Sequence, residues 1–420
     1  MRRLLSQLRP LAPYRVQAGI LLLAVAIAAA TGGVLVAREG GSGESGAVPE
    51  AGVENQGERD TSFLARIVPP PADDGGTGGP RVPRTVGDLV RRLPVERKVA
   101  QLFLVGFPGK DLTSPIFQQL RRLDLGGIVI DRRNYDGPQT LGTLAGETRV
   151  IAGQEHHVPP WVMAPQEGGE FSAFRDLPPA GSPADIASPA DAGRTAAVAG
   201  KTLRELGVTG VLAPVIDVGL ETDPALGARV FSDNAVRVAQ YAVQSVTAYD
   251  RQRMFSAVKH FPGLGTASQP TEEGPAQVGL SDVELEDRDL VPFRAAFRAG
   301  APGVVLSHAL YTVDDFTIPG SLSRKVVTGL LRDRLKFRGV AITDDLADPG
   351  ITALESVPHA AVKAVQAGAD MLWISGSAGD QQAAYVAVLQ AVRRRRISRR
   401  RLDEAVGRLL TAKRRFGMIS

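Results

Sequence analysis

Residues 303–345 read GVVLSHALYTVDDFTIPGSLSRKVVTGLLRDRLKFRGVAITDD. Two short apolar runs, Gly303–His308 and Gly339–Thr343, flank a segment, Lys325–Leu335, in which apolar residues recur at helical spacing. Short β-branched runs bounded by turn residues are typical of buried strands, and the periodicity between them indicates a crossover helix. The stretch therefore predicts two parallel strands joined through a helix.

The same alternation runs through the chain from Val86 to Ser420. The eight predicted strands are Phe103–Phe107, Gly126–Ile130, Trp161–Ala164, Gly210–Val218, Phe255–His260, Gly303–His308, Gly339–Thr343 and Met371–Ser375. The predicted helices include Pro115–Leu123, Ala190–Leu206, Ala235–Tyr249, Asp289–Ala299, Lys325–Leu335, Ala360–Ala367, Gln381–Arg395 and Arg399–Arg415. Eight such units predict an α/β fold, a (β/α)8 TIM-type barrel over residues 86–420. The alternative is an open doubly wound sheet, but no Gly-x-Gly-x-x-Gly motif follows the first strand.

Composition excludes several classes of protein. The 420 residues are 44% hydrophobic and 22% charged, which is enough apolar sequence for a large core. The formal net charge is only +4, so we expect no nucleic-acid partner. The chain has no cysteine and five histidines, which excludes disulfides and thiolate metal sites and disfavours a multi-histidine metal centre.

The N-terminal region predicts export and attachment to a membrane. Residues 1–15 are rich in arginine and read as a cytoplasmic basic segment, and the uncharged apolar run Val16–Ala37 is long enough to cross a bilayer as a helix. Residues 38–85 are rich in Gly and Pro and read as a flexible linker. We expect a single-pass membrane protein with the barrel outside the cytoplasm. The alternative is a secreted protein, because Ala28–Ala30 resembles a signal cleavage site.

Charged and imidazole side chains follow five successive predicted strands. Because the active sites of such barrels lie at the C-terminal ends of the strands, we expect these side chains to share one rim and form a ligand site. They are Glu167, Asp217, Arg229, Lys259, His260, His308 and Asp344.

Several of these motifs resemble glycoside hydrolase family 3, in its single-domain β-N-acetylhexosaminidase subgroup. Gln166–Gly169 matches the family's Gln/His-Glu-Gly-Gly turn, Lys259–Gly263 matches its Lys-His-Phe-Pro-Gly signature, and Thr343–Leu346 is similar to its nucleophile strand. The resemblance covers Val86 to Ser420 in order. It implies a retaining glycosidase that needs no metal or organic cofactor.

The resemblance also implies residue roles. Asp344 matches the catalytic nucleophile, and a strand-end carboxylate facing the anomeric carbon is what a retaining step needs. Lys259, His260 and Arg229 match sugar-binding positions, and Glu167, Asp217 and His308 are expected to bind substrate beside them. The alternative for Lys259 and Arg229 is a salt bridge to Glu167 or Asp217.

The loop after the fifth strand departs from the family pattern. Leu264 replaces a histidine, and Pro270 and Glu272 stand where the family's Asp-x-His acid/base would be. Upstream, Pro165 and Ala173 replace residues that bind the sugar in the subgroup. One hypothesis is that Glu272 serves as the general acid. The other is that the barrel is a non-catalytic glycan-binding or scaffolding relative.

The expected partner is an external carbohydrate, with peptidoglycan-derived amino sugar as the family-based candidate, and we expect a monomer. Near the C-terminus, residues 393–401 carry Arg393–Arg396 and Arg399–Arg401. These arginines fit either an anionic wall polymer or lipid, or solvated helix ends whose C-terminal dipole favours cations.

Overall fold

The structure is a computed structural model that describes residues 84–420. The predicted segments 1–15 and 16–37, and all but the last two residues of 38–85, lie outside the described residues. Helix α3 (Arg84–Arg92) begins two residues before the predicted start of the barrel. Between Arg84 and Ser420, no helix is both long and apolar enough to span a membrane.

Eight parallel strands form the barrel. In spatial order they are β10 (Leu372–Ile374), β1 (Phe103–Val105), β2 (Gly127–Val129), β3 (Trp161–Ala164), β4 (Gly210–Val211), β5 (Phe255–Phe261), β7 (Gly303–Leu306) and β9 (Val340–Thr343). A parallel bridge between Ile342 and Met371 joins the two ends of this sheet and closes it. The predicted α/β TIM-type barrel is therefore confirmed.

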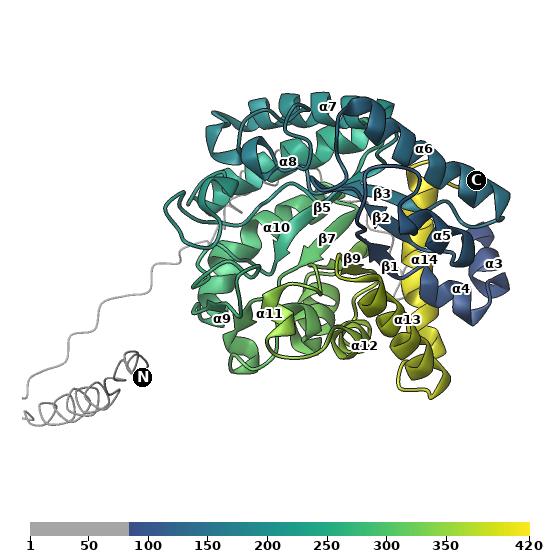
Figure 1. The fold of residues 1–420 in the computed structure, drawn as a ribbon. Helices are drawn as coiled ribbons and strands as arrows, with labels where there is room; N and C mark the ends of the chain where they lie inside the picture. The colour runs from purple at the N-terminus through teal and green to yellow at the C-terminus, as the bar shows by residue number, and fades with distance from the viewer. Residues whose placement is uncertain (1–83) are drawn as a thin grey trace, which may run out of the picture. The chain divides into compact units, whose positions relative to one another are not determined.

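Helices alternate with the strands and surround them (Figure 1). The main ones are α4 (Val95–Ala100), α5 (Pro115–Arg122), α6 (Pro138–Gln154), α7 (Pro189–Glu205), α8 (Ala235–Arg251), α10 (Leu290–Arg298), the π-helical segment η7 (Lys325–Arg334), α12 (Val357–Ala367), α13 (Ala378–Arg393) and α14 (Arg399–Arg415). Since parallel neighbours need a return crossover, these helices run back toward the N-terminal ends of the strands.

Several strands are one or two residues shorter than predicted, and two elements differ more strongly. The strand predicted over Gly210–Val218 pairs regularly only at Gly210–Val211, because Pro214 has no N–H for the ladder; Val215 then makes a single bridge to Lys259. Helix α6 was not among the predicted helices. Its three internal glycines give it a poor helix propensity, and it is held by packing of residues such as Leu141 and Ile151.

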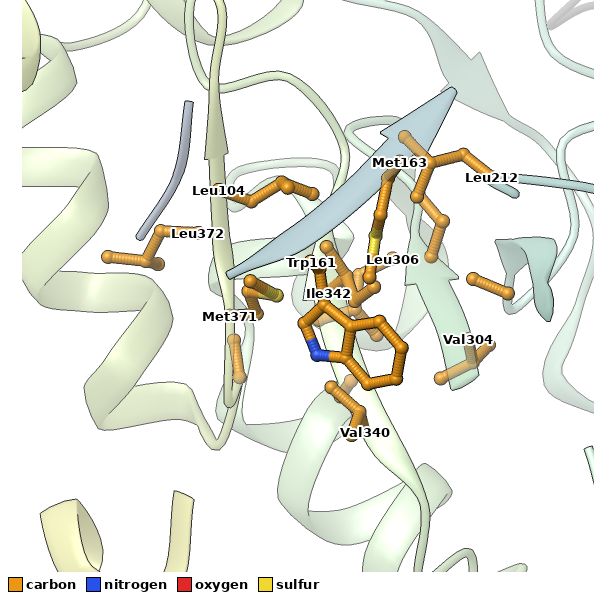
Figure 2. Close-up of a cluster of buried hydrophobic side chains, with 14 of the residues drawn as sticks. Leu104, Trp161, Met163, Leu212, Val304, Leu306, Val340, Ile342, Met371 and Leu372 are labelled. Carbon is orange, nitrogen blue, oxygen red and sulfur yellow. The ribbon is translucent and has the colours of Figure 1, made fainter. Parts of the chain in front are cut away.

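The barrel interior is filled by apolar side chains from alternating strand positions. Figure 2 shows Met163 of β3, Leu306 of β7 and Ile342 of β9 among this cluster. At the N-terminal end of the strands, Trp161 packs against Phe255 with 4.8 Å between ring centroids. Phe416, just after α14, contacts both rings, so the C-terminal helix closes this end of the barrel.

Asp370 fixes α14 to the barrel. This carboxylate is completely buried before β10 and contacts Arg332, Arg401 and Arg408 at 2.5, 3.0 and 2.9 Å. Burial alone would raise the pKa of Asp370, but the three guanidinium groups outweigh it and hold that pKa below its usual value. One carboxylate thus neutralises cations from two helices beneath the strands.

We predict that Asp370→Asn strongly destabilises the protein. The substitution leaves three cations around a neutral amide, and removing one partner of a buried ion pair costs about 3–5 kcal/mol. Denaturant unfolding measures the free energy. The exposed Asp333, changed to Asn, is the matched control and should shift stability by less than about 0.5 kcal/mol. Equal stability of the two variants would contradict this account.

Candidate active site

Polar residues from successive strand ends contact one another at one rim, as the sequence predicts. Glu167 follows β3, Asp217 lies beyond β4, and Lys259 and His260 belong to β5. Asp344 directly follows β9. The contacts among them are direct, so the barrel assembles these side chains into one cluster.

Glu167 is the centre of a buried ion cluster. Its side chain is 5% exposed, and its two oxygens accept bonds of 2.7 and 2.9 Å from Nε and Nη2 of Arg229. Lys259 Nζ lies 2.5 Å from Oε1. Burial would raise the pKa of Glu167, but Arg229 and Lys259 lower it to about 2. The salt bridge that the sequence left as an alternative for Arg229 and Lys259 is therefore present.

His260 is held in one orientation by Asp217. The buried carboxylate of Asp217 lies 2.7 Å from Nδ1 of His260 and also accepts a hydrogen bond from the His260 backbone N–H. The N–H of Leu264 donates to the same carboxylate at 2.8 Å. With Nδ1 engaged, Nε2 lies 3.8 Å from an oxygen of Asp344. This arrangement orients a hydrogen-bonding edge of the imidazole toward Asp344.

Asp344 is the carboxylate that this cluster surrounds. Its side chain is 10% exposed, and the N–H of Asp345 donates to Oδ1 at 3.0 Å. Burial opposes ionisation, but the neighbouring imidazoles of His260 and His308 and the Lys259 ammonium hold the pKa of Asp344 below its ordinary value. Asp345 instead bonds the backbone N–H groups of Ala347 and Ser375. Only the first carboxylate of the pair is available for chemistry.

Asp217 and His308, two of the predicted substrate-binding residues, are buried and make hydrogen bonds within the protein. His308 is fully buried, with Nδ1 2.8 Å from Ser321 Oγ and Nε2 3.0 Å from the Asp345 carbonyl. Asp217 has no exposed side-chain surface. Asp217 therefore orients His260, and His308 supports the turn that carries Asp344; substrate binding by these two residues stays a prediction.

Glu272 lies at the edge of this cluster. Its side chain is 47% exposed, and one oxygen is 3.4 Å from Arg229 Nη1. The predicted general acid is thus close to the predicted nucleophile's ion cluster, but it is paired with a cation.

Comparison with known proteins identifies the family. Residues 94–412 match the profile of the glycosyl hydrolase family 3 N-terminal domain. The chain belongs to glycosyl hydrolase family 3. Family membership makes the barrel a glycosidase, as the resemblance implies, and two curated relatives carry the name "Beta-hexosaminidase". The relative from Stenotrophomonas maltophilia is 30% identical over 65% of this chain and 83% of its own length. That from Nitrosomonas eutropha is 29% identical over 64% and 79%.

Solved structures show the same barrel. A family 3 β-N-acetylglucosaminidase from Paenibacillus sp. matches with a TM-score of 0.75 and 32% identity, over 78% of this chain. This chain spans only 63% of that one. A β-N-acetylhexosaminidase from Beutenbergia cavernae matches with a TM-score of 0.70 and 28% identity, and 98% of its chain is covered.

Within this family 3 barrel, one further carboxyl group was missed by the sequence analysis. Asp348 caps helix α11 (Pro349–Thr352) through its backbone, but its side chain makes no capping hydrogen bond. Burial, followed by the charges of Asp344, Asp345 and Glu272, raises the pKa of Asp348 to about 9. The N–H of Gly350 donates to the Thr271 carbonyl at 2.8 Å, which joins this turn to the loop of Glu272. The only sequence signal was a third carboxylate shortly after Asp344-Asp345.

A second unusual carboxyl group lies below the signature loop. Asp289 is 1% exposed, and neither oxygen has a hydrogen bond, although Arg288 Nη1 is 3.3 Å away. Burial raises its pKa to about 7. Gly263 passes over it with a positive φ of 141°, and a Cβ there would lie 2.5 Å from Asp289 Oδ2. The Gly at the end of Lys-His-Phe-Pro-Gly is therefore required by this close approach.

The residues from Arg84 to Ser420 contain no group of three or more His, Asp or Glu side chains arranged to hold a metal ion.

Asp289 should make stability depend on pH. The pKa of Asp289 is about 7 in the folded protein and 3.8 ordinarily, so the folded protein binds this proton more tightly than the unfolded chain does. Protonation of Asp289 therefore stabilises the folded state fully below pH 4, and this contribution is lost as pH rises through 7. The loss is about 4 kcal/mol at pH 8. We predict that Asp289→Asn flattens the difference in unfolding free energy between pH 5 and pH 8. Its exposed neighbour Asp287, changed to Asn, should leave the difference unchanged. A wild-type slope in Asp289→Asn would refute this assignment.

Proposed function

We propose that this family 3 protein is a retaining, β-N-acetylhexosaminidase-like glycosidase of the cell envelope. Two lines of support lead there. The curated relatives and solved neighbours are named for hexosaminidase or N-acetylglucosaminidase activity. The rim cluster lowers the pKa of Asp344, whose side chain stays partly exposed. Polar side chains that could bind a sugar lie beside it.

Asp344 is the proposed nucleophile, and its environment carries the proposal. A retaining step requires an ionised carboxylate that attacks the anomeric carbon, and the lowered pKa of Asp344 supplies one at neutral pH. Arg229 would donate hydrogen bonds to the sugar hydroxyls or the N-acetyl group, and Nε2 of His260 would form a hydrogen bond in the same space. Lys259 and Arg229 also fix Glu167, so the donors are positioned before substrate arrives.

The proton for the leaving group comes, in this proposal, from one of two carboxyl groups that replace the family's histidine. Glu272 was predicted from the sequence, and one of its oxygens lies 3.4 Å from Nη1 of Arg229. Asp348 was found in the structure and keeps its proton through neutral pH. Asp344 and Asp348 form a pair of carboxyl groups whose pKa values are pushed apart, which is the usual basis for dividing nucleophile and acid roles.

The substrate class follows from the relatives and from the predicted topology. We propose a peptidoglycan-derived or related amino sugar, met outside the cytoplasm by a monomer that the apolar run 16–37 attaches to the membrane. Secretion after signal cleavage remains the alternative topology. A non-catalytic glycan-binding relative is the alternative function, favoured by the pairing of Glu272 with Arg229.

We predict that Asp344→Asn lowers kcat for an aryl N-acetyl-β-glucosaminide by on the order of 10³-fold or more. An amide cannot form the covalent glycosyl intermediate. The exposed rim residue Glu170, changed to Gln, is the matched control and should keep wild-type kcat. A wild-type rate in Asp344→Asn would remove the proposed nucleophile. No turnover in the wild type, with oligosaccharide binding retained, would favour the glycan-binding alternative.

The two acid candidates can be separated by the leaving group. Losing the general acid should cost about 10²–10⁴-fold on an alkyl glycoside, whose alkoxide needs protonation, and little on a dinitrophenyl glycoside, whose phenolate does not. If Asp348 is the acid, activity falls as pH rises through about 9, and Asp348→Asn removes this limb. Glu272→Gln shows the leaving-group effect instead if Glu272 is the acid. Equal losses on both substrates in both variants would contradict either assignment.

A further inference from the structure

The face of the barrel opposite the proposed active site carries many basic residues. The barrel helices end at this face, and most of them end in cations: Arg121, Arg122, Arg204, Arg251, Arg298, Arg334, Arg393, Arg414 and Arg415. One basic residue at a helix C-terminus is ordinary, because the helix dipole favours it. A parallel barrel gathers these ends on the same side, and some of the cations are paired there: Arg121 with Glu147, Arg334 with Glu286, Arg393 with Glu96 and Arg415 with Asp250.

A cavity of about 620 Å³ lies at this face, between the last turns of α10 and η7 and helix α14. Seven of its lining side chains are cationic, and none is acidic. Some of them are neutralised from outside the lining: Glu286 contacts Arg294 and Arg334, and Asp250 contacts Arg415. The carboxylates near this cavity are therefore fewer than its cations.

Three cations of this lining have no carboxylate partner within the described chain. Arg298, Lys336 and Arg338 are exposed, and none makes a salt bridge or a side-chain hydrogen bond to residues 84–420. Arg408, paired with Asp370, also has its buried Nε without a hydrogen bond. The phenyl rings of Phe297 and Phe337, which stack 4.3 Å apart, supply an apolar wall. Unpaired cations can bind an anionic headgroup, and the adjacent aromatic wall can contact the apolar part of the same lipid molecule.

The described chain also starts at this face. Arg414, in the last turn of α14, donates from Nη1 to Thr85 Oγ1 at 2.6 Å, and α3 packs against α14. Arg415 of the cavity is the next residue. The first described residues of the barrel therefore lie beside the basic cavity and away from Asp344.

We propose that this basic face, defined by Arg298, Lys336 and Arg338 with the surrounding helix ends, rests on an anionic lipid bilayer and directs the active-site rim away from it. The inference uses the proposed membrane span for its geometry and does not depend on hydrolysis. Each basic residue near an anionic surface strengthens association about fivefold. The attraction acts only within a Debye length, about 8 Å at physiological salt.

The absence of cysteine allows a direct test with the full chain. A single fluorophore is placed either at Ser420→Cys, on the basic side, or at Leu220→Cys, an exposed residue of the active-site rim. Ser420 lies at the N-terminal end of the strands. Met418, two residues before it, lines a cavity together with Pro160 and Gly207, which precede β3 and β4. Each labelled protein is reconstituted in nanodiscs of phosphatidylglycerol or phosphatidylcholine that contain a headgroup quencher.

We expect several-fold stronger quenching at Ser420→Cys than at Leu220→Cys in phosphatidylglycerol. This difference should disappear in phosphatidylcholine, in 0.5 M NaCl, and in Arg298→Gln/Lys336→Gln/Arg338→Gln. The control, Lys110→Gln/Arg175→Gln/Arg324→Gln, removes the same charge from exposed positions elsewhere and should keep the difference. Both triple variants should hydrolyse a soluble substrate at the wild-type rate, which separates this test from the proposed function.

Three results would overturn the proposal. They are equal quenching at the two labels in phosphatidylglycerol, the same effect from both triple variants, and failure of the full chain to associate with phosphatidylglycerol discs at low salt.

Discussion

A carboxylate can stay ionised inside an apolar barrel mouth only if other groups replace the water that it loses. Glu167 meets this constraint through Arg229 and Lys259, which arrive from the loop after β4 and from β5. The cluster therefore requires three successive strand ends to be in register. Once it forms, its cations also lower the pKa of Asp344. Folding and the proposed chemistry depend on the same charges.

The chain divides its charges between two ends of the barrel. At the C-terminal rim, carboxyl groups are kept in different protonation states, with Asp344 ionised and Asp348 protonated near neutral pH. At the N-terminal end, Asp370 binds three arginines and leaves a cationic excess around them. A parallel barrel permits this division, because strand ends and helix ends point to opposite faces. The proposed orientation on a membrane uses that separation.

The fold was predictable because its signal is local: each strand is a short apolar run between turn residues, and the largest shortening of a predicted strand occurs at Pro214. The rim cluster was predictable as well, since residues that follow parallel strands must share a rim. Exposure was not. His308 and Asp217 are buried by contacts far apart in sequence, such as Ser321 with His308, and the protonation of Asp348 depends on the packing of Gly350 against Thr271. The burial that sets these properties is a result of tertiary packing.

The central claim is that Asp344 forms the covalent glycosyl-enzyme. A fluorinated N-acetylhexosaminyl fluoride, which reacts quickly and hydrolyses slowly, would trap that species for peptide mass spectrometry. The account predicts an adduct of one sugar on the peptide with Asp344 and none on a protein in which this residue is Asn. An adduct on Asp345 or Asp348, or turnover of the inhibitor with inversion and no adduct, would contradict it.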